Sequence, residues 1–78
     1  MYSAEQIRNK AYIPDPSEGP FGVKEIELRI MLSDYKGSNQ IMVKSEEIHH
    51  TTPAWLRTKG YNVESVDFLG TKFWQISW

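Results

Sequence analysis

The sequence has no cysteine, no long apolar run and almost no net charge, and each of these absences excludes a class of protein. Without cysteine the chain has neither a disulfide framework nor a thiolate metal site. Its apolar runs are too short for a transmembrane helix, and Met1 is not followed by the basic and apolar regions of a secretory signal. The formal charge of −1 lacks the basic excess that is typical of nucleic-acid binders. We therefore expect neither a membrane protein nor a dedicated nucleic-acid binder.

Motifs for catalysis are also missing. The glycines in Gly19–Gly22 are not followed by the Lys-Ser/Thr pair of a phosphate loop, and no serine stands in a nucleophile-elbow pattern. The acidic side chains of Glu25, Glu27, Glu64 and Asp67 are expected to face water rather than to share a pocket. A chain of 78 residues also leaves little room for both a core and a substrate cavity. We therefore expect no enzymatic activity and no cofactor.

One short stretch contains residue types that bind metal ions. Glu46 and Glu47 precede His49 and His50, and on a helix Glu46 and His50 would lie on one face. A metal site needs two or three converging ligands, and no second His or Cys cluster completes this set. The prediction is a solvated polar loop without a metal ion.

The composition fits one small globular domain that spans residues 1–78. Apolar residues make up 40% of the chain, which is enough for a core and too many for a disordered segment. All three tryptophans and two of the three phenylalanines fall in residues 52–78, so most of the core material is expected there. Domains of this size without disulfides often need oligomerisation or a partner for stability.

The N-terminal quarter predicts a helix and then a linker. Residues 1–13 contain Ser3 and Gln6 at capping-box spacing, and Pro14 would end the helix. Residues 14–22 contain three prolines and form a stiff spacer towards the remaining α+β core at 23–78. The apolar face of the helix would consist of Ala4, Ile7 and Ala11.

The segment from residue 23 to residue 36 fits two interpretations. Its apolar and charged residues alternate as in a strand, so that 23–44 could form a β-hairpin that turns near Gly37. Its composition favours a helix, because strong helix formers dominate and Gly37 suits the C′ position. We prefer the helix and retain the hairpin as the alternative. The buried stripe of the helix would consist of Leu28, Met31, Leu32 and Tyr35.

The C-terminal half predicts a strand, a capped helix and a β-hairpin. Residues 40–44 alternate as a short strand. Thr52 and Pro53 suit the N-cap and first position of the helix, and Gly60 suits the C′ position of a Schellman motif. Two strands then meet at a turn near Leu69-Gly70. The expected core anchors are Leu56, Tyr61, Trp74, Ile76 and Trp78, and the candidate partner contacts are Trp55, Arg57 and Phe73.

The predicted fold class is therefore α+β. Its order is ααβαββ: two N-terminal helices, a short strand, a capped helix and a C-terminal β-hairpin. The strands would form a small, mostly antiparallel sheet with the helices on one face.

Two motifs near the C-terminus point to a family. The helix closes on Leu56-x-x-x-Gly60-Tyr61-x-Val63, and the chain closes on Ile76-Ser-Trp. In these motifs the chain resembles a group of small uncharacterised tailed-phage proteins, fairly well over residues 40–78 and loosely before them, and the resemblance is specific to the closing motifs only. The resemblance implies a phage origin and an α+β fold, and it implies no catalytic residues.

The leading functional hypothesis is a non-enzymatic phage protein that acts by protein–protein contact, as an accessory subunit of the virion (decoration or connector). One alternative is a phage-encoded inhibitor of a host enzyme or defence protein. A second is a winged-helix-like nucleic-acid binder, with 52–59 as recognition helix and 62–78 as wing. A small-molecule or metal binder is the third. The expected location is the virion or the host cytoplasm, and a homo-oligomer would fit the small size.

Overall fold

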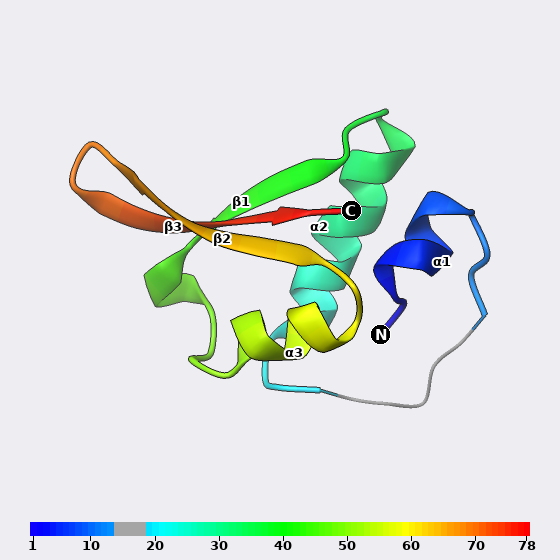
Figure 1. Ribbon diagram of the computed structural model, residues 1–78, viewed down its shortest axis with the longest axis horizontal. Coiled ribbons are helices and arrows are strands. Elements are labelled where there is room, and N and C mark those ends of the chain that lie inside the picture. Colours follow the sequence, from blue (N-terminus) through cyan, green and yellow to red (C-terminus); the bar gives the residue numbers. More distant parts are fainter. Residues whose placement is uncertain (14–18) are drawn as a thin grey trace.

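The computed structural model describes residues 1–13 and 19–78, and within them the chain has the predicted α+β fold. The order ααβαββ is confirmed, with one short 3₁₀ turn in addition. Residues 14–18 of the predicted linker lie outside the described part of the chain. The elements are α1 (Ala4–Arg8), α2 (Val23–Tyr35), β1 (Gln40–Lys44), η1 (Ser45–Glu47), α3 (Thr52–Thr58), β2 (Asn62–Phe68) and β3 (Thr71–Ser77) (Figure 1).

The three strands form one antiparallel sheet in the order β1-β3-β2, so the last strand of the chain lies at its centre. Ile76 of β3 is fully buried and pairs with Ile41 on one side and Val63 on the other. Two residues earlier, Trp74 pairs with Val43 and points to the same face. This face of the sheet forms one wall of the core.

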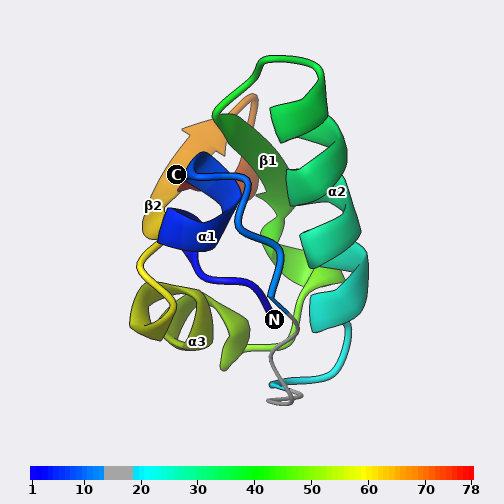
Figure 2. The ribbon, with the colours of Figure 1, turned by 90° about the vertical axis from the view of Figure 1, so that its right-hand side faces the viewer.

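The helices cover this inner face and close the core. Figure 2 shows α2 beside β1, α3 near β2, and α1 between the two helices at the end of the sheet. No helix among residues 1–13 and 19–78 has the length and apolar character needed to cross a lipid bilayer. Most of the buried apolar residues precede residue 52, so the prediction that residues 52–78 supply most of the core is wrong. The core consists of Met1, Ala4, Ile7, Val23, Ile26, Ile30, Ile41, Val43, Leu56, Tyr61, Val63, Ile76 and Trp78.

Helix α1 has the predicted N-terminus but ends earlier than predicted. The Ser3 side chain accepts the Gln6 N–H and the Gln6 side chain accepts the Ser3 N–H, which confirms the capping box. The helix ends at Arg8 because Lys10 adopts a positive φ of 56°, which no helix continues. Ala11 is therefore exposed rather than on the buried face, and the helix ends well before the predicted stop at Pro14, which lies outside the described residues.

Polar contacts attach the N-terminal segment to the core. The Tyr2 N–H donates to Glu27 Oε2 at 2.8 Å, and the Tyr61 hydroxyl donates to the Tyr2 carbonyl oxygen at 2.8 Å. Burial, and then the nearby Glu27 carboxylate, raise the pKa of Tyr61. At the far end of α1, a hydrogen bond from the Lys10 ammonium is the main cause that lowers the pKa of Asp34. These contacts hold a helix that is too short to persist alone.

Segment 23–36 is the helix that its composition favours, and the alternative β-hairpin is wrong. The predicted buried stripe is also wrong, because α2 turns its other apolar face to the sheet. Leu28, Leu32 and Tyr35 are exposed, and Met31 is only half-buried. The buried residues of α2 are Val23, Ile26 and Ile30.

Helix α3 ends as predicted but begins one residue earlier. The Tyr61 N–H donates to the Leu56 carbonyl and the Gly60 N–H donates to the Arg57 carbonyl, which confirms the Schellman motif. Thr51 rather than Thr52 is the N-cap residue. The Thr51 side chain makes no capping hydrogen bond, and the buried Thr52 hydroxyl has no hydrogen-bond partner among the described residues.

The β2–β3 turn requires positive φ at two residues. Gly70 has a φ of 79°, and Leu69 before it has a φ of 51°. Two-residue hairpin loops of this kind match the twist of the strands, and Asn-Gly is their preferred sequence. Leucine at the first position stores backbone strain, because its Cβ crowds the backbone in this conformation.

Replacing Leu69 with asparagine is expected to raise the free energy of unfolding by about 1 kcal/mol, because asparagine tolerates this conformation. Leu69 is 90% exposed, so the substitution removes almost no packing. Chemical denaturation of the variant and of Leu69→Val measures the effect. The β-branched valine should lower stability, and equal stability of all three proteins would show that the turn is unstrained.

Candidate functional site

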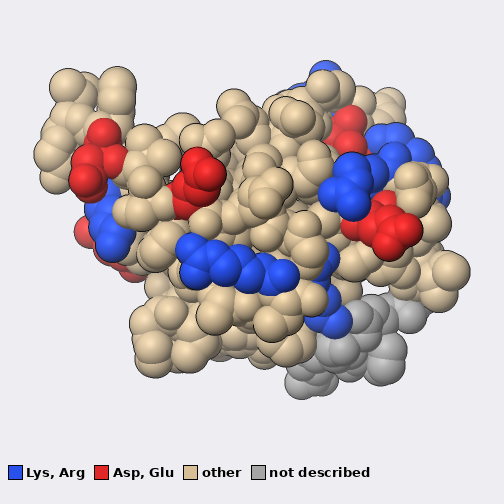
Figure 3. Space-filling model, in the orientation of Figure 1, with Lys and Arg blue, Asp and Glu red and all other residues tan. Residues whose placement is uncertain are grey.

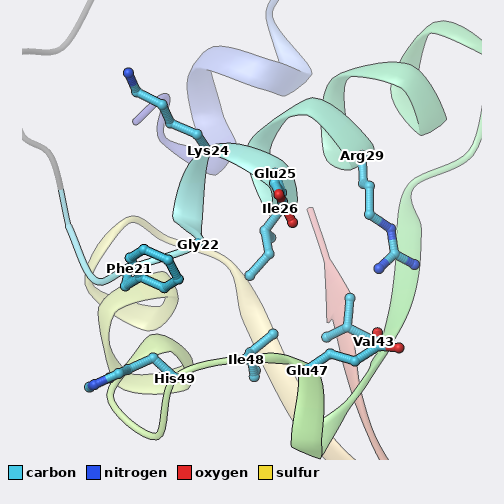
Figure 4. Close-up of a pocket in the computed structure, with 10 residues that line it drawn as sticks. All are labelled: Phe21, Gly22, Lys24, Glu25, Ile26, Arg29, Val43, Glu47, Ile48 and His49. Carbon is cyan, nitrogen blue, oxygen red and sulfur yellow. The ribbon is translucent and has the colours of Figure 1, made fainter.

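A surface groove of about 400 Å³ lies between the first half of α2, the end of β1 and the segment that follows it. Its residues come from elements that are far apart in the sequence, so only the folded chain forms it. Figure 4 shows Phe21 and His49 at one end and Arg29 and Glu47 at the other. The groove is lined by Phe21, Gly22, Lys24, Glu25, Ile26, Arg29, Val43, Glu47, Ile48 and His49.

The backbone at Gly22 determines where Phe21 points. Gly22 is the N-cap of α2 and has a φ of 84°, a conformation that glycine adopts without strain. The Val23 N–H donates to the Pro20 carbonyl at 3.2 Å, which closes a turn directly before the helix. The turn directs Phe21 away from the core, and its side chain is 91% exposed at the mouth of the groove.

The floor of the groove is apolar and its rim is charged. Ile26 and Val43 are buried, and half-buried Ile48 packs against the same core. Figure 4 shows Ile26 and Ile48 extending toward each other across the floor. The Arg29 guanidinium donates to the Met42 carbonyl at 2.8 Å, and this bond holds it at the β1 end of the rim. An apolar floor with a charged rim is the arrangement found in protein-binding patches.

The histidines next to the groove make contacts within their own segment. His49 Nδ1 lies 2.7 Å from Thr51 Oγ1 and accepts the Thr51 N–H at 3.3 Å. The rings of His49 and His50 are 4.3 Å apart and tilted by 31°. Among the residues that the structure describes, no three His, Asp or Glu side chains converge as metal ligands would.

The three predicted partner contacts lie apart from one another. Trp55 is half-buried on α3, and its indole packs so closely on Gly19 that a Cβ there would lie 2.7 Å from Nε1. Arg57 donates to the Val63 carbonyl at 2.9 Å. Phe73 is half-buried. It lies on the outer face of the sheet, because adjacent strand residues point to opposite faces and Trp74 points to the inner one. Their role as partner contacts stays a prediction, and the structure does not unite them in one site.

Four of the five expected core anchors are buried. Leu56, Tyr61, Ile76 and Trp78 belong to the core. Trp74 is only half-buried. Its ring centroid lies 6.0 Å from Arg57 Cζ and 5.1 Å from Lys72 Nζ, which fits cation–π contacts. Figure 3 shows a band of Lys and Arg side chains across this face of the molecule.

The most exposed apolar residue beside the groove, Phe21, was not among the candidates from the sequence. It follows a proline within the predicted linker, where neither helical nor strand periodicity applies. Its position between Pro20 and Gly22 could have indicated that Phe21 is exposed, because these residue types form turns and turns lie at the protein surface.

Comparisons with protein-family models, with curated proteins and with solved structures gave no significant match.

Proposed function

We propose that this chain is a non-enzymatic protein that binds another protein through the groove and Phe21. The observation that carries the proposal is the 91% exposure of Phe21 beside an apolar floor. Aromatic side chains are enriched among the residues that contribute most to binding between proteins. The partner would insert an apolar side chain over Ile26 and Ile48. Rim charges of both signs, from Lys24 to Glu47, would fix its orientation.

The proposed partner is a structural protein of a tailed-phage particle, which makes this chain an accessory subunit of the virion. The resemblance of the closing motifs at Leu56–Val63 and Ile76–Trp78 supports this assignment. Mass spectrometry of purified, nuclease-treated particles tests it. Stoichiometric amounts of the chain would support a decoration or connector subunit. Its presence only in infected-cell lysate would favour the inhibitor of a host protein instead, and affinity capture from host extract would then identify the partner.

Replacing Phe21 with serine is expected to weaken binding to that partner at least about tenfold, because an exposed aromatic anchor is lost. The free energy of unfolding should change by less than about 0.5 kcal/mol, since Phe21 contributes little to the core. Titration calorimetry measures binding and chemical denaturation measures stability.

The matched control is Phe68→Ser, which removes a second exposed phenylalanine at the distant hairpin turn. This variant should bind as the original protein does. If Phe68→Ser loses binding while Phe21→Ser retains it, the hairpin turn is the contact surface and the groove is not. A salt-sensitive shift of duplex DNA by the original protein would instead support the nucleic-acid alternative.

A further inference from the structure

The outer face of α2 carries an apolar stripe that nothing in the described chain covers. Leu28, Leu32 and Tyr35 are 67%, 54% and 87% exposed. Their spacing of four and three residues places them on one side of the helix, opposite the buried side with Ile26 and Ile30. In Figure 2, no other helix or strand lies on the outer side of α2. We call these three residues the α2 stripe.

The spacing of the residues in the α2 stripe is typical of a helix face that packs against a second helix. A helix at the surface of a monomer normally presents polar residues to water. Here the outer side repeats apolar residues at i, i+4 and i+7, the spacing of a coiled-coil seam. Helix α2 has 13 residues and is about 20 Å long, so the stripe spans two of its turns.

Two charges beside the α2 stripe are placed so that another copy of α2 would complement them. Glu25 and Lys36 are both exposed and lie on the same side of the stripe, because they are eleven residues, or about three turns, apart. Along the helix, the point halfway between Glu25 and Lys36 lies within about one residue of the point halfway between Leu28 and Tyr35. One two-fold axis therefore serves both the apolar contacts and the charges.

We propose that a second copy of this chain covers the α2 stripe in an antiparallel pair of α2 helices. Leu28 then packs against Tyr35 of the second copy, and Leu32 meets its own equivalent near the axis. Glu25 faces Lys36 of the second copy at both ends, which makes two symmetric ion pairs. In a parallel pair, Glu25 of one copy and Lys36 of the other would lie about three helical turns apart, so neither ion pair could form. Arg29 lies on the same side of the stripe, but its guanidinium donates a hydrogen bond to the Met42 carbonyl and is therefore directed to β1 rather than to the second copy.

The proposal does not rest on the function proposed above, because no residue of the α2 stripe lines the groove. Of the other residues used here, Glu25 and Arg29 do line it. Sedimentation equilibrium of the full chain from about 5 to about 500 µM tests it, the range in which a small interface dissociates. We expect a monomer–dimer equilibrium. Leu32→Glu should raise the dissociation constant at least about tenfold, while the matched change Leu69→Glu at the hairpin turn leaves it unaltered. A wild-type monomer throughout, or a dimer that tolerates Leu32→Glu, overturns the proposal.

A charge exchange tests the antiparallel arrangement. Glu25→Lys and Lys36→Glu should each weaken the dimer about three- to tenfold, and the double variant should restore it. Because the chain has no cysteine, directed disulfides give a second readout. Leu28→Cys and Tyr35→Cys proteins should cross-link when oxidised as a mixture, and each alone should cross-link poorly. Efficient cross-linking of each variant with itself would overturn the antiparallel pair. Phe21→Ser should leave the dimer intact, so a failed dimer and a failed groove are distinguishable.

Discussion

Replacing Ile30 with alanine is expected to lower the free energy of unfolding by about 2–5 kcal/mol, the usual cost of truncating a fully buried aliphatic side chain. Ile30 has no exposed surface, and α2 presents it to the core beside Ile26. The cost combines the lost transfer free energy of the methyl groups with the cavity that remains. Chemical denaturation followed by circular dichroism measures the change.

The matched control for Ile30→Ala is Leu32→Ala, two residues further along the same helix. Leu32 is more than half exposed, so this substitution should cost less than about 0.5 kcal/mol in a dilute, monomeric sample. The pair decides which face of α2 is buried. If Leu32→Ala lowers the free energy of unfolding much more than Ile30→Ala does, the buried face is the stripe predicted from the sequence and not the face that the structure buries.

Replacing Glu27 with alanine is expected to lower the free energy of unfolding by about 2 kcal/mol, a large effect for a polar residue. The Glu27 carboxylate accepts the Tyr2 N–H at 2.8 Å and lies 4.0 Å from the ammonium group of Met1. Alanine leaves that N–H without an acceptor and removes the charge that faces the ammonium group. Because these contacts hold the N-terminal segment, hydrogen exchange should accelerate in α1 before it does in the sheet.

Two further substitutions separate the role of Glu27 from a general effect of charge. Glu64→Ala removes an exposed carboxylate from the sheet and should change stability by less than about 0.5 kcal/mol. Glu27→Gln retains an oxygen that can accept the Tyr2 N–H and should cost less than Glu27→Ala. If all three variants are equally stable, the N-terminal segment does not depend on Glu27.

The sequence identified most helices and strands because their signals are local. The bounds of β1 match the predicted strand, and Gly60 ends α3 in the predicted Schellman motif. Capping residues bond backbone groups a few positions away, so their effect does not depend on the rest of the fold. The same locality explains the correct helix start at Ser3.

The errors occurred where two local solutions compete and tertiary contacts select one. Helix α2 has apolar residues on both sides, and periodicity gives no ranking between Ile30 and Leu32. The choice follows from the position of β1 and β3, because the packed core accepts the side with Val23 and Ile30. The early end of α1 has the same origin, since Lys10 leaves the helix to reach Asp34 on α2.

The sequence by itself determined the α+β class and the order of the elements, because helix capping and strand alternation are properties of residue type and short spacing. It did not determine the core, because Trp55, Phe73 and Trp74 are only half-buried and aliphatic residues of α1, α2 and β1 take their place. Only the tertiary structure decided what the surface offers. It separated Trp55, Arg57 and Phe73, formed the groove at Phe21, and left the α2 stripe exposed. A surface depends on which segments meet after folding. The spacing of residues along the chain does not show that α2 packs against β1, and the groove forms between these two elements.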